Sequence, residues 1–287
     1  MLRLAVRVRR EQAEIVLAEL LSLAPSGVEE VSIGSGEVVE YAVYGAPGEL
    51  PALPDLTAAA GEALVDVRTS EVADDWDRRW REFHKPLVLE GRLAVRPPWE
   101  DAVGTPIEIV IDPGQAFGTG AHATTRLCLE LMLSVAARGA FLDLGCGSGV
   151  LAIAAARLGW EPVLALDYDP ASVEATIDNA RVNGVAIEVR RHDLRVDPVV
   201  CAPVVAANLL RPLLLAWVAR LGSAVVLPAL PEIVIASGLL VGEADEVAGA
   251  FGAVGLTESA RRESGEWAAL LLERRRRNRR RRDREGA

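Results

Sequence analysis

The chain has 287 residues, which is enough for one large domain or two of ordinary size, and 51% of them are hydrophobic, which can build a substantial core. The net charge of −10 is unevenly distributed, because residues 274–287 hold nine arginines against Asp283 and Glu285. No apolar run is long enough for a membrane-spanning helix. Length, composition and charge therefore exclude an unfolded chain and predict a globular protein with an acidic body and a basic, disordered tail.

Cysteine and histidine, which form disulfides and zinc sites, are sparse in this chain. The three cysteines lie far apart in apolar segments, and the three histidines form no HxxxH pair. We therefore expect no disulfide framework, no metal ion and a reducing, cytoplasmic location. The residues concerned are Cys128, Cys146, Cys201, His84, His122 and His192.

The first 68 residues predict a small α+β domain. Their strands and helices follow the order βαββαβ, which is typical of a ferredoxin-like fold. The expected strands cover residues 2–9, 28–33, 37–44 and 64–68, and the expected helices cover 11–23 and 55–63.

A charged and aromatic segment, "DDWDRRWREFH" at 74–84, follows this domain and predicts a linker helix within residues 69–85. Trp76, Trp80 and Phe83 recur at helical spacing, so the stripe is expected to pack the helix onto a domain. A hinge near 66–74 is the alternative, since it would let the N-terminal domain reorient.

Residues 86–273 predict a doubly wound, Rossmann-like α/β domain, because strands alternate with helices and several strands are apolar throughout, as in a parallel sheet covered on both faces. The expected strands cover 140–144, 162–167, 186–190, 203–207 and 232–237, the helices cover 149–158, 170–182, 211–221 and 241–251, and a last pair of elements lies near 254–260 and 267–273.

A glycine loop lies between the first of these strands and its helix, in "FLDLGCGSGVLAIAAARLG". Gly145, Gly147 and Gly149 permit a close approach of backbone amides to a ligand. Asp167 ends the next strand, where a carboxylate can accept hydrogen bonds from both ribose hydroxyls of a nucleoside. The two features together indicate an adenosine-containing ligand.

The charge of the site favours one such ligand. Asp143, two residues before the first glycine, would repel the pyrophosphate of a dinucleotide and attract the ammonium group of S-adenosyl-L-methionine (AdoMet). The spacing is also G-x-G-x-G rather than G-x-G-x-x-G. AdoMet is therefore favoured; a nicotinamide or flavin cofactor, or glycines that serve only a tight turn, are the alternatives.

Asn208 ends the fourth strand, in "AANLLRPLLL". Ligands of open α/β sheets lie beyond the carboxyl ends of the strands, so Asn208 is expected to face the reacting centre. Its other interpretation is a helix cap, because a helix is predicted from residue 211.

Four segments resemble, in order, those of the bacterial ribosomal protein L11 methyltransferases: "DPGQAFGTGAHATTRLCLE", "LDLGCGSGVLAIAAARLG", "ALDYDP" and "ANLLRPL". The resemblance covers residues 70–273, and the first 68 residues match in arrangement more than in letters. It implies methyl transfer from AdoMet to the N-terminal α-amine and to lysines of ribosomal protein L11, a large-subunit protein held by the N-terminal domain.

The resemblance also implies roles for individual residues. Thr125, Gly145, Asp167 and Asn208 are expected to contact AdoMet, with Asn208 near the methyl donor. The segment "FGTGAHATT" looks like the family's active-site loop, in which Phe117 would exclude water and Gly118 and Gly120 would let the chain bend.

His122 is the candidate proton acceptor or amine-orienting group, and packing against the sheet is its other interpretation. The family usually has Thr-His-Pro-Thr-Thr here, whereas Ala121 and Ala123 flank His122 in this chain. Leu209, Leu210 and Arg211 stand where methyltransferases of planar amide or base nitrogens have two prolines and an aromatic residue, which argues against DNA adenine or release-factor glutamine as the substrate.

Three alternatives stay open from the sequence. The acceptor could be another protein or a small-molecule amine, or the chain could be a non-catalytic, AdoMet-dependent module that binds ribosomes. The Arg-rich tail, residues 274–287, could contact ribosomal RNA or be solvated low-complexity sequence.

Overall fold

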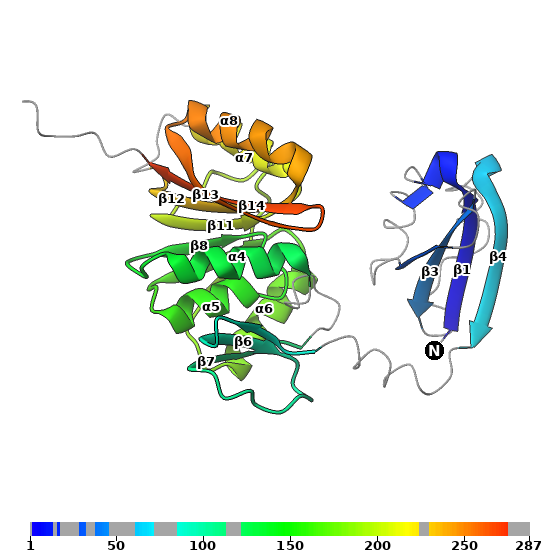
Figure 1. The fold of residues 1–287 in the computed structure, drawn as a ribbon, viewed down its shortest axis with the longest axis horizontal. Coiled ribbons are helices and arrows are strands. Elements are labelled where there is room, and N and C mark those ends of the chain that lie inside the picture. Colours follow the sequence, from blue (N-terminus) through cyan, green and yellow to red (C-terminus); the bar gives the residue numbers. More distant parts are fainter. Residues whose placement is uncertain are drawn as a thin grey trace, which may run out of the picture. The chain divides into compact units, whose positions relative to one another are not determined.

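A computed structural model describes residues 2–13, 16–17, 29–32, 38–45, 61–71, 85–112, 122–223 and 230–274. The chain divides into two compact units, Met1–Phe83 and His84–Ala287. Figure 1 shows the elements of each unit. Within the described residues no helix has the length and apolar character that crossing a membrane requires.

The N-terminal unit contains a four-stranded antiparallel sheet in the order β2-β3-β1-β4. Alternate residues of the central strand, Leu4, Val6 and Val8, are buried on one face, as a half-buried strand requires. The strands are β1 (Leu2–Arg9), β2 (Glu29–Ser32), β3 (Val38–Gly45) and β4 (Leu64–Glu71), with short 3-10 turns η1 (Arg10–Gln12) and η2 (Gly61–Ala63).

The four strands agree with those expected from the sequence, except that β4 continues to Glu71. Residues 69–71 therefore belong to the strand and not to the linker. The linker helix expected over 74–84, and most of the helices expected over 11–23 and 55–63, lie outside the described residues.

The C-terminal unit is built around a seven-stranded, mostly parallel sheet in the order β10-β9-β8-β11-β12-β14-β13 (Figure 1). Only β14 runs in the opposite direction, since it pairs antiparallel with β12 on one side and with β13 on the other. The chain builds outward from β8 in one direction and from β11 in the other, so a topological switch lies between these two strands. The strands are β8 (Phe141–Leu144), β9 (Val163–Asp167), β10 (Glu188–Arg191), β11 (Val204–Asn208), β12 (Ile233–Leu240), β13 (Leu256–Ser264) and β14 (Trp267–Arg274).

Helices cover both faces of this sheet and form two separate cores. Residues of α4 and α5 bury one face with Phe141 and Trp160, whereas α7 and α8 bury the other with Trp217 and Phe251. The helices are α4 (Ala123–Ser134), α5 (Val150–Leu158), α6 (Pro170–Val182), α7 (Arg211–Ser223) and α8 (Ala244–Ala253). The expected doubly wound domain is therefore confirmed, with α8 preceded by the 3-10 turn η3 (Val241–Glu243).

A three-stranded sheet, which the sequence pattern did not predict, precedes α4. It consists of β5 (Leu87–Leu89), β6 (Leu93–Arg96) and β7 (Ile107–Val110). Its buried residues Leu93 and Ile109 join the core that α4 and α5 form. Asn183, just after α6, pairs with the outer strand β7: its Oδ1 accepts from the Val110 N–H at 2.8 Å and its Nδ2 donates to the Val110 carbonyl at 2.6 Å.

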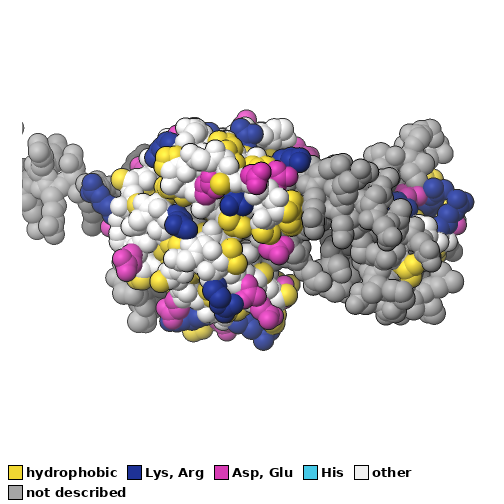
Figure 2. All heavy atoms as spheres, turned by 90° about the horizontal axis from the view of Figure 1, so that it is seen from below, with side chains coloured by type: hydrophobic (Ala, Val, Ile, Leu, Met, Phe, Trp, Pro, Cys, Tyr) yellow, Lys and Arg dark blue, Asp and Glu magenta, His cyan; other side chains and the backbone are white. Residues whose placement is uncertain are grey.

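The surface of the C-terminal unit mixes charges of both signs. Figure 2 shows basic, acidic and apolar side chains interspersed on one face of its described part. That face carries no continuous basic stripe of the kind that nucleic-acid-binding proteins use.

Candidate active site

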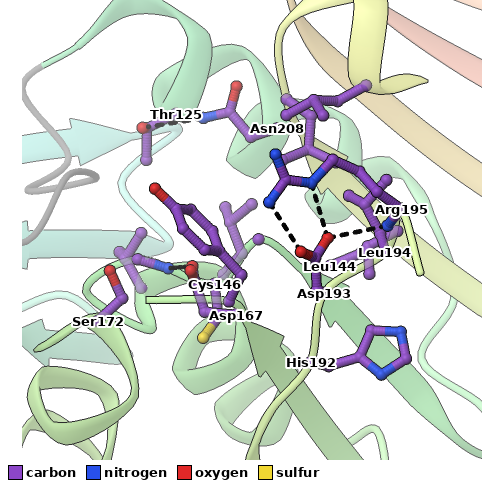
Figure 3. Close-up of a pocket in the computed structure, with 17 residues that line it drawn as sticks. Thr125, Leu144, Cys146, Asp167, Ser172, His192, Asp193, Leu194, Arg195 and Asn208 are labelled. Atoms are coloured by element: carbon purple, nitrogen blue, oxygen red, sulfur yellow. Dashed lines mark hydrogen bonds and ion pairs between the residues drawn. The ribbon is translucent and has the colours of Figure 1, made fainter. Parts of the chain in front are cut away.

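A cavity of about 360 Å³ lies at the carboxyl ends of the central parallel strands. It is bordered by the loop that follows β8, by the ends of β9 and β11, and by the first turn of α4. Figure 3 shows Thr125 and Asn208 on one side of the cavity and Asp167 and Ser172 on another. The cavity has the place expected for the ligand of an open α/β sheet.

The glycine loop is held in a conformation that favours glycine. Gly145, Gly147 and Gly149 have φ angles of 79°, 54° and 82°, in the left-handed region. The amides of Gly145 and Cys146 donate to the Leu166 carbonyl at 2.8 and 3.0 Å. A Cβ on Gly145 would lie 2.4 Å from Cδ2 of Leu209, a residue that also lines the cavity. A side chain at this position would therefore intrude on the site.

Asp167 is fixed at the cavity by two backbone groups. Its Oδ2 accepts from the Gly147 N–H at 2.9 Å, and its Oδ1 accepts from the Asp169 N–H at 3.0 Å. Asp169 itself caps α6, so the carboxylate lies between the glycine loop and a helix N-terminus. Because each carboxylate oxygen has a second lone pair, both can still accept hydrogen bonds from ribose hydroxyls.

Thr125, from α4, and Asn208, from the end of β11, meet on one side of the cavity. Asn208 Nδ2 donates to Thr125 Oγ1 at 3.4 Å, and Thr125 is fully buried. Asn208 Oδ1 is buried and has no hydrogen-bond partner among the described residues. A buried acceptor without a partner costs free energy, so this atom fits an N–H donor of a bound molecule. The amines of AdoMet and of a methyl acceptor are such donors.

Asp143, which the sequence analysis expected to face the ligand, does not line the cavity. Its side chain is fully buried beneath the glycine loop and is absent from the cavity lining. Its Oδ2 accepts from the Ala152 N–H of α5 at 2.9 Å. Burial, opposed by this hydrogen bond and reinforced by the charge of Asp167, raises the pKa of Asp143 to about 7. The geometry thus gives Asp143 a contact with α5 and no direct contact with the cavity.

His122 is the N-cap of α4. Its Nδ1 lies 3.3 Å from the Thr124 backbone nitrogen and 2.8 Å from Thr124 Oγ1, and its ring meets Trp267 edge-on at 4.9 Å between centroids. Burial lowers the pKa of His122, and the charge of Glu266 partly offsets this effect. The ring therefore packs against Trp267 of β14 and is not among the residues that line the cavity. The predicted residues Phe117, Gly118 and Gly120 lie outside the described residues.

The sequence pattern did not indicate one side of the cavity, which follows β9 and β10. Tyr168 lies there with Asp193 and Arg195, whose guanidinium donates to both carboxylate oxygens of Asp193 at 2.7 and 2.8 Å. Hydrogen bonds from Arg195 lower the pKa of Asp193 to about 2. The available signal was "HDLR" at 192–195, one residue after the predicted strand at 186–190, since the observed strand β10 ends with Arg191 paired beside Asp167. The lining of the whole cavity also includes Ser172, His192, Leu194, Leu209 and Leu213.

Comparison with known proteins agrees with this architecture. The family described as Ribosomal protein L11 methyltransferase (PrmA) matches residues 52–275, well over half of the chain. A relative named ribosomal protein L11 methyltransferase from Pelotomaculum thermopropionicum is 40% identical over 213 residues, which cover 72% of this chain and 68% of the relative. A relative of the same name from Bordetella bronchiseptica is 34% identical, over 94% of this chain and 98% of the relative.

A solved structure gives the same result. The ribosomal protein L11 methylase from Lactobacillus delbrueckii subsp. bulgaricus superimposes with a TM-score of 0.59 at 31% identity, covering 67% of this chain and 99% of the other. The seven-stranded sheet, the cavity and these similarities lead to one assignment. This chain belongs to the ribosomal protein L11 methyltransferase family and has its AdoMet-dependent methyltransferase fold.

Proposed function

We propose that this protein transfers methyl groups from AdoMet to amines of ribosomal protein L11, namely its N-terminal α-amine and lysine side chains. The observation that carries the proposal is the buried side-chain oxygen Oδ1 of Asn208, which has no hydrogen-bond partner among the described residues and lies at the cavity of a chain that belongs to the L11 methyltransferase family. A substrate of this kind would place the enzyme in the cytoplasm.

The residues of the cavity fit AdoMet. Gly145 and Gly147 allow the loop to lie against the ligand, Asp167 would accept from the ribose hydroxyls, and Thr125 and Asn208 would border the methionine end. AdoMet supplies a methyl group activated by its positive sulfur. No covalent enzyme intermediate is required, so the protein needs no nucleophilic side chain.

The task of the protein is to present a neutral amine in line with that methyl group. An α-amine has a pKa of about 8 and loses its proton readily, whereas a lysine, at about 10.4, must be desolvated or meet a proton acceptor. Asn208 Oδ1 would accept from an amine N–H and so direct the nitrogen lone pair. Alignment and exclusion of water would supply most of the rate increase.

Two further residues complete the proposed site. His122 would orient the amine or take its proton, or would act only by fixing the start of α4, which carries Thr125. Phe117 would exclude water from the reacting groups, on the strength of the resemblance in "FGTGAHATT".

The N-terminal unit would hold the protein substrate. The antiparallel order β2-β3-β1-β4 supports a ferredoxin-like domain of about the predicted extent, residues 1–68, joined by the linker to the catalytic domain. Such a module favours a protein acceptor over a small amine, which would need no recognition domain. The Arg-rich tail would add nonspecific, salt-dependent contact with ribosomal RNA.

Incubation with methyl-labelled AdoMet and unmodified L11 tests the proposal. We expect label in L11, and mass spectrometry should locate it on the α-amine and on lysines. Label on small amines alone would identify a different substrate class. AdoMet binding without any transfer would identify a non-catalytic module, and either result would overturn the proposal.

A further inference from the structure

Helix α6 presents two buried polar side chains to the glycine loop. Thr176 is fully buried, and its Oγ1 donates to the Gly147 carbonyl at 2.9 Å and lies 3.2 Å from Cys146 Sγ. Asn179, three residues later, is 4% exposed, and its Nδ2 donates to the Ser148 carbonyl at 2.9 Å. Two successive carbonyls of the loop are thus bound by side chains of one helix.

These hydrogen bonds set the orientation of the loop. The carbonyl and the N–H on either side of a trans peptide bond lie in one plane and point in opposite directions. Fixing the carbonyls of Gly147 and Ser148 therefore also fixes the amides that follow them. Glycine leaves these peptides free to rotate, since it permits both signs of φ. The loop also closes a turn of its own, because the Gly149 N–H donates to the Cys146 carbonyl at 2.8 Å. The hydrogen bonds from α6 therefore reinforce this turn and add a second constraint on its peptide orientation.

Asn179 is also anchored on its other side. Its Oδ1 accepts from the Asp112 N–H at 3.2 Å, just beyond the end of β7. The amide is thereby held between β7 and the loop and cannot turn without breaking both hydrogen bonds. Thr176 lies against the loop as well: a Cβ on Gly149 would be 2.8 Å from its Cγ2.

We propose that Thr176 and Asn179 are positioning residues that hold the peptide groups of the glycine loop in their cofactor-binding orientation and so set the affinity for AdoMet. Neither residue belongs to the cavity lining, and both act through the loop. The inference rests on the proposed function only in taking AdoMet as the ligand of this cavity.

The Thr176 hydroxyl can be tested with a pair of variants. Thr176→Val preserves the shape of the side chain and removes the donor, whereas Thr176→Ser keeps the hydroxyl. Calorimetric titration with AdoMet should show roughly tenfold weaker binding for Thr176→Val, the effect of losing about one hydrogen bond in the bound state, and near wild-type binding for Thr176→Ser. Equal affinities for the two variants would count against the proposal.

Asn179 has a matched control on the same chain segment. Asn183 is equally buried at 4% and also binds the β7 region, yet its side chain contacts Val110 and the Asn179 carbonyl and not the glycine loop. Asn179→Asp and Asn183→Asp each convert one buried amide to a carboxyl group. Only Asn179→Asp removes the donor to Ser148.

We expect both aspartate variants to lower the melting temperature and only Asn179→Asp to weaken AdoMet binding, again by roughly tenfold. If both weakened it equally, or neither did, the role of Asn179 would be purely structural. These outcomes are separable from the proposed function, because AdoMet binding is measured without L11. If the wild-type protein bound AdoMet but left L11 unlabelled, this result would disprove the proposed function and leave the positioning roles of Thr176 and Asn179 untouched.

Discussion

The side-chain amide of Asn208, at the end of β11, donates to the hydroxyl of Thr125 in the first turn of α4, with 3.4 Å between Nδ2 and Oγ1. This contact joins two distant parts of the chain at the cavity. It also turns Asn208 Oδ1 into a fixed acceptor that no other described residue uses. The packing of α4 against the end of β11 thus sets the position of the acceptor that we propose for the reacting amine.

Replacing this acceptor should affect turnover more than cofactor binding. We expect Asn208→Ala to lower kcat by about 100-fold, as is typical when a reacting group loses its alignment, and to change the Kd for AdoMet much less. Steady-state kinetics with L11 and calorimetry with AdoMet measure the two effects. Unchanged turnover would remove Asn208 from the set of catalytic residues.

Gly238 supports Asn208 from the neighbouring strand. It has a φ of +82°, and a Cβ there would lie 2.6 Å from the Leu209 carbonyl oxygen. Gly238→Ala should therefore displace the Asn208–Leu209 segment and lower both kcat and the melting temperature. Gly255→Ala is the control, because Gly255 has a φ of +86° and a Cβ there would meet no atom within 4 Å.

Both glycine variants incur the left-handed backbone cost of about 1–2 kcal/mol in the free energy of unfolding. Only Gly238→Ala adds a collision with backbone atoms. Equal kcat values for the two variants would show that the Leu209 contact does not position Asn208.

Asp143 should make stability depend on pH. Burial raises its pKa to about 7 from an ordinary value of 3.8, so between these pH values the folded state binds more protons than the unfolded state. Stability therefore falls as the pH rises through this window, by up to about 4 kcal/mol at 1.4 kcal/mol per pKa unit. Asp143→Asn should remove this slope, so that denaturant unfolding at pH 5 and pH 8 shows the variant gaining relative to wild type at the higher pH. A parallel pH dependence in the two proteins would contradict the assignment.

His122 has two proposed roles that one pair of variants separates. His122→Asn keeps a cap acceptor for the Thr124 N–H, whereas His122→Ala loses it, at a cost of about 1 kcal/mol. If the ring takes a proton in catalysis, both variants lose turnover, and lysine methylation suffers more than α-amine methylation because the lysine proton is harder to remove. Because the ring packs against Trp267 and does not line the cavity, we expect near wild-type turnover of His122→Asn, which would leave only the capping role. Loss of turnover in both variants would instead show that the ring takes part in the proton transfer.

The stability of the His122 variants should depend on pH differently from that of the wild-type protein. Because burial lowers the pKa of His122 below 6.5, the folded state disfavours the charged ring, and wild-type stability is lost as the pH falls below that value. Melting temperatures of His122→Asn should lack this component. A decline in the variant as steep as that of wild type, or steeper, would contradict this assignment.

Apolar strands of the parallel sheet, such as β9 and β11, could be predicted from sequence, and so could α6, because Asp169 before Pro170 is a clear cap. The sheet β5-β6-β7 could not, since its short strands are not directly followed by a glycine loop or a capped helix of the kind that follows β8 and β9. Gly145 and Asp167 were placed correctly at the cavity because they end or follow buried strands.

Asp143 shows where this reasoning fails. Proximity to the glycines suggested a carboxylate facing the ligand, but the side chains of a strand alternate between faces, and this one meets the amide of Ala152 in α5. The contacts of Thr176 and Asn179 were also invisible, because they depend on how α6 packs against the loop. A threonine and an asparagine at positions 176 and 179 of a helix do not by themselves indicate contact with the glycine loop.

The pairing of Asn183 with Val110 has a consequence for the association of this protein with other chains. An outer strand exposes backbone donors and acceptors on which a foreign strand can assemble, and such edges are common starting points of aggregation. Asn183 satisfies the N–H and the carbonyl of Val110 with one amide, as another peptide group would. The side chain thereby caps the edge of β7 at this residue and denies it to intermolecular β-pairing.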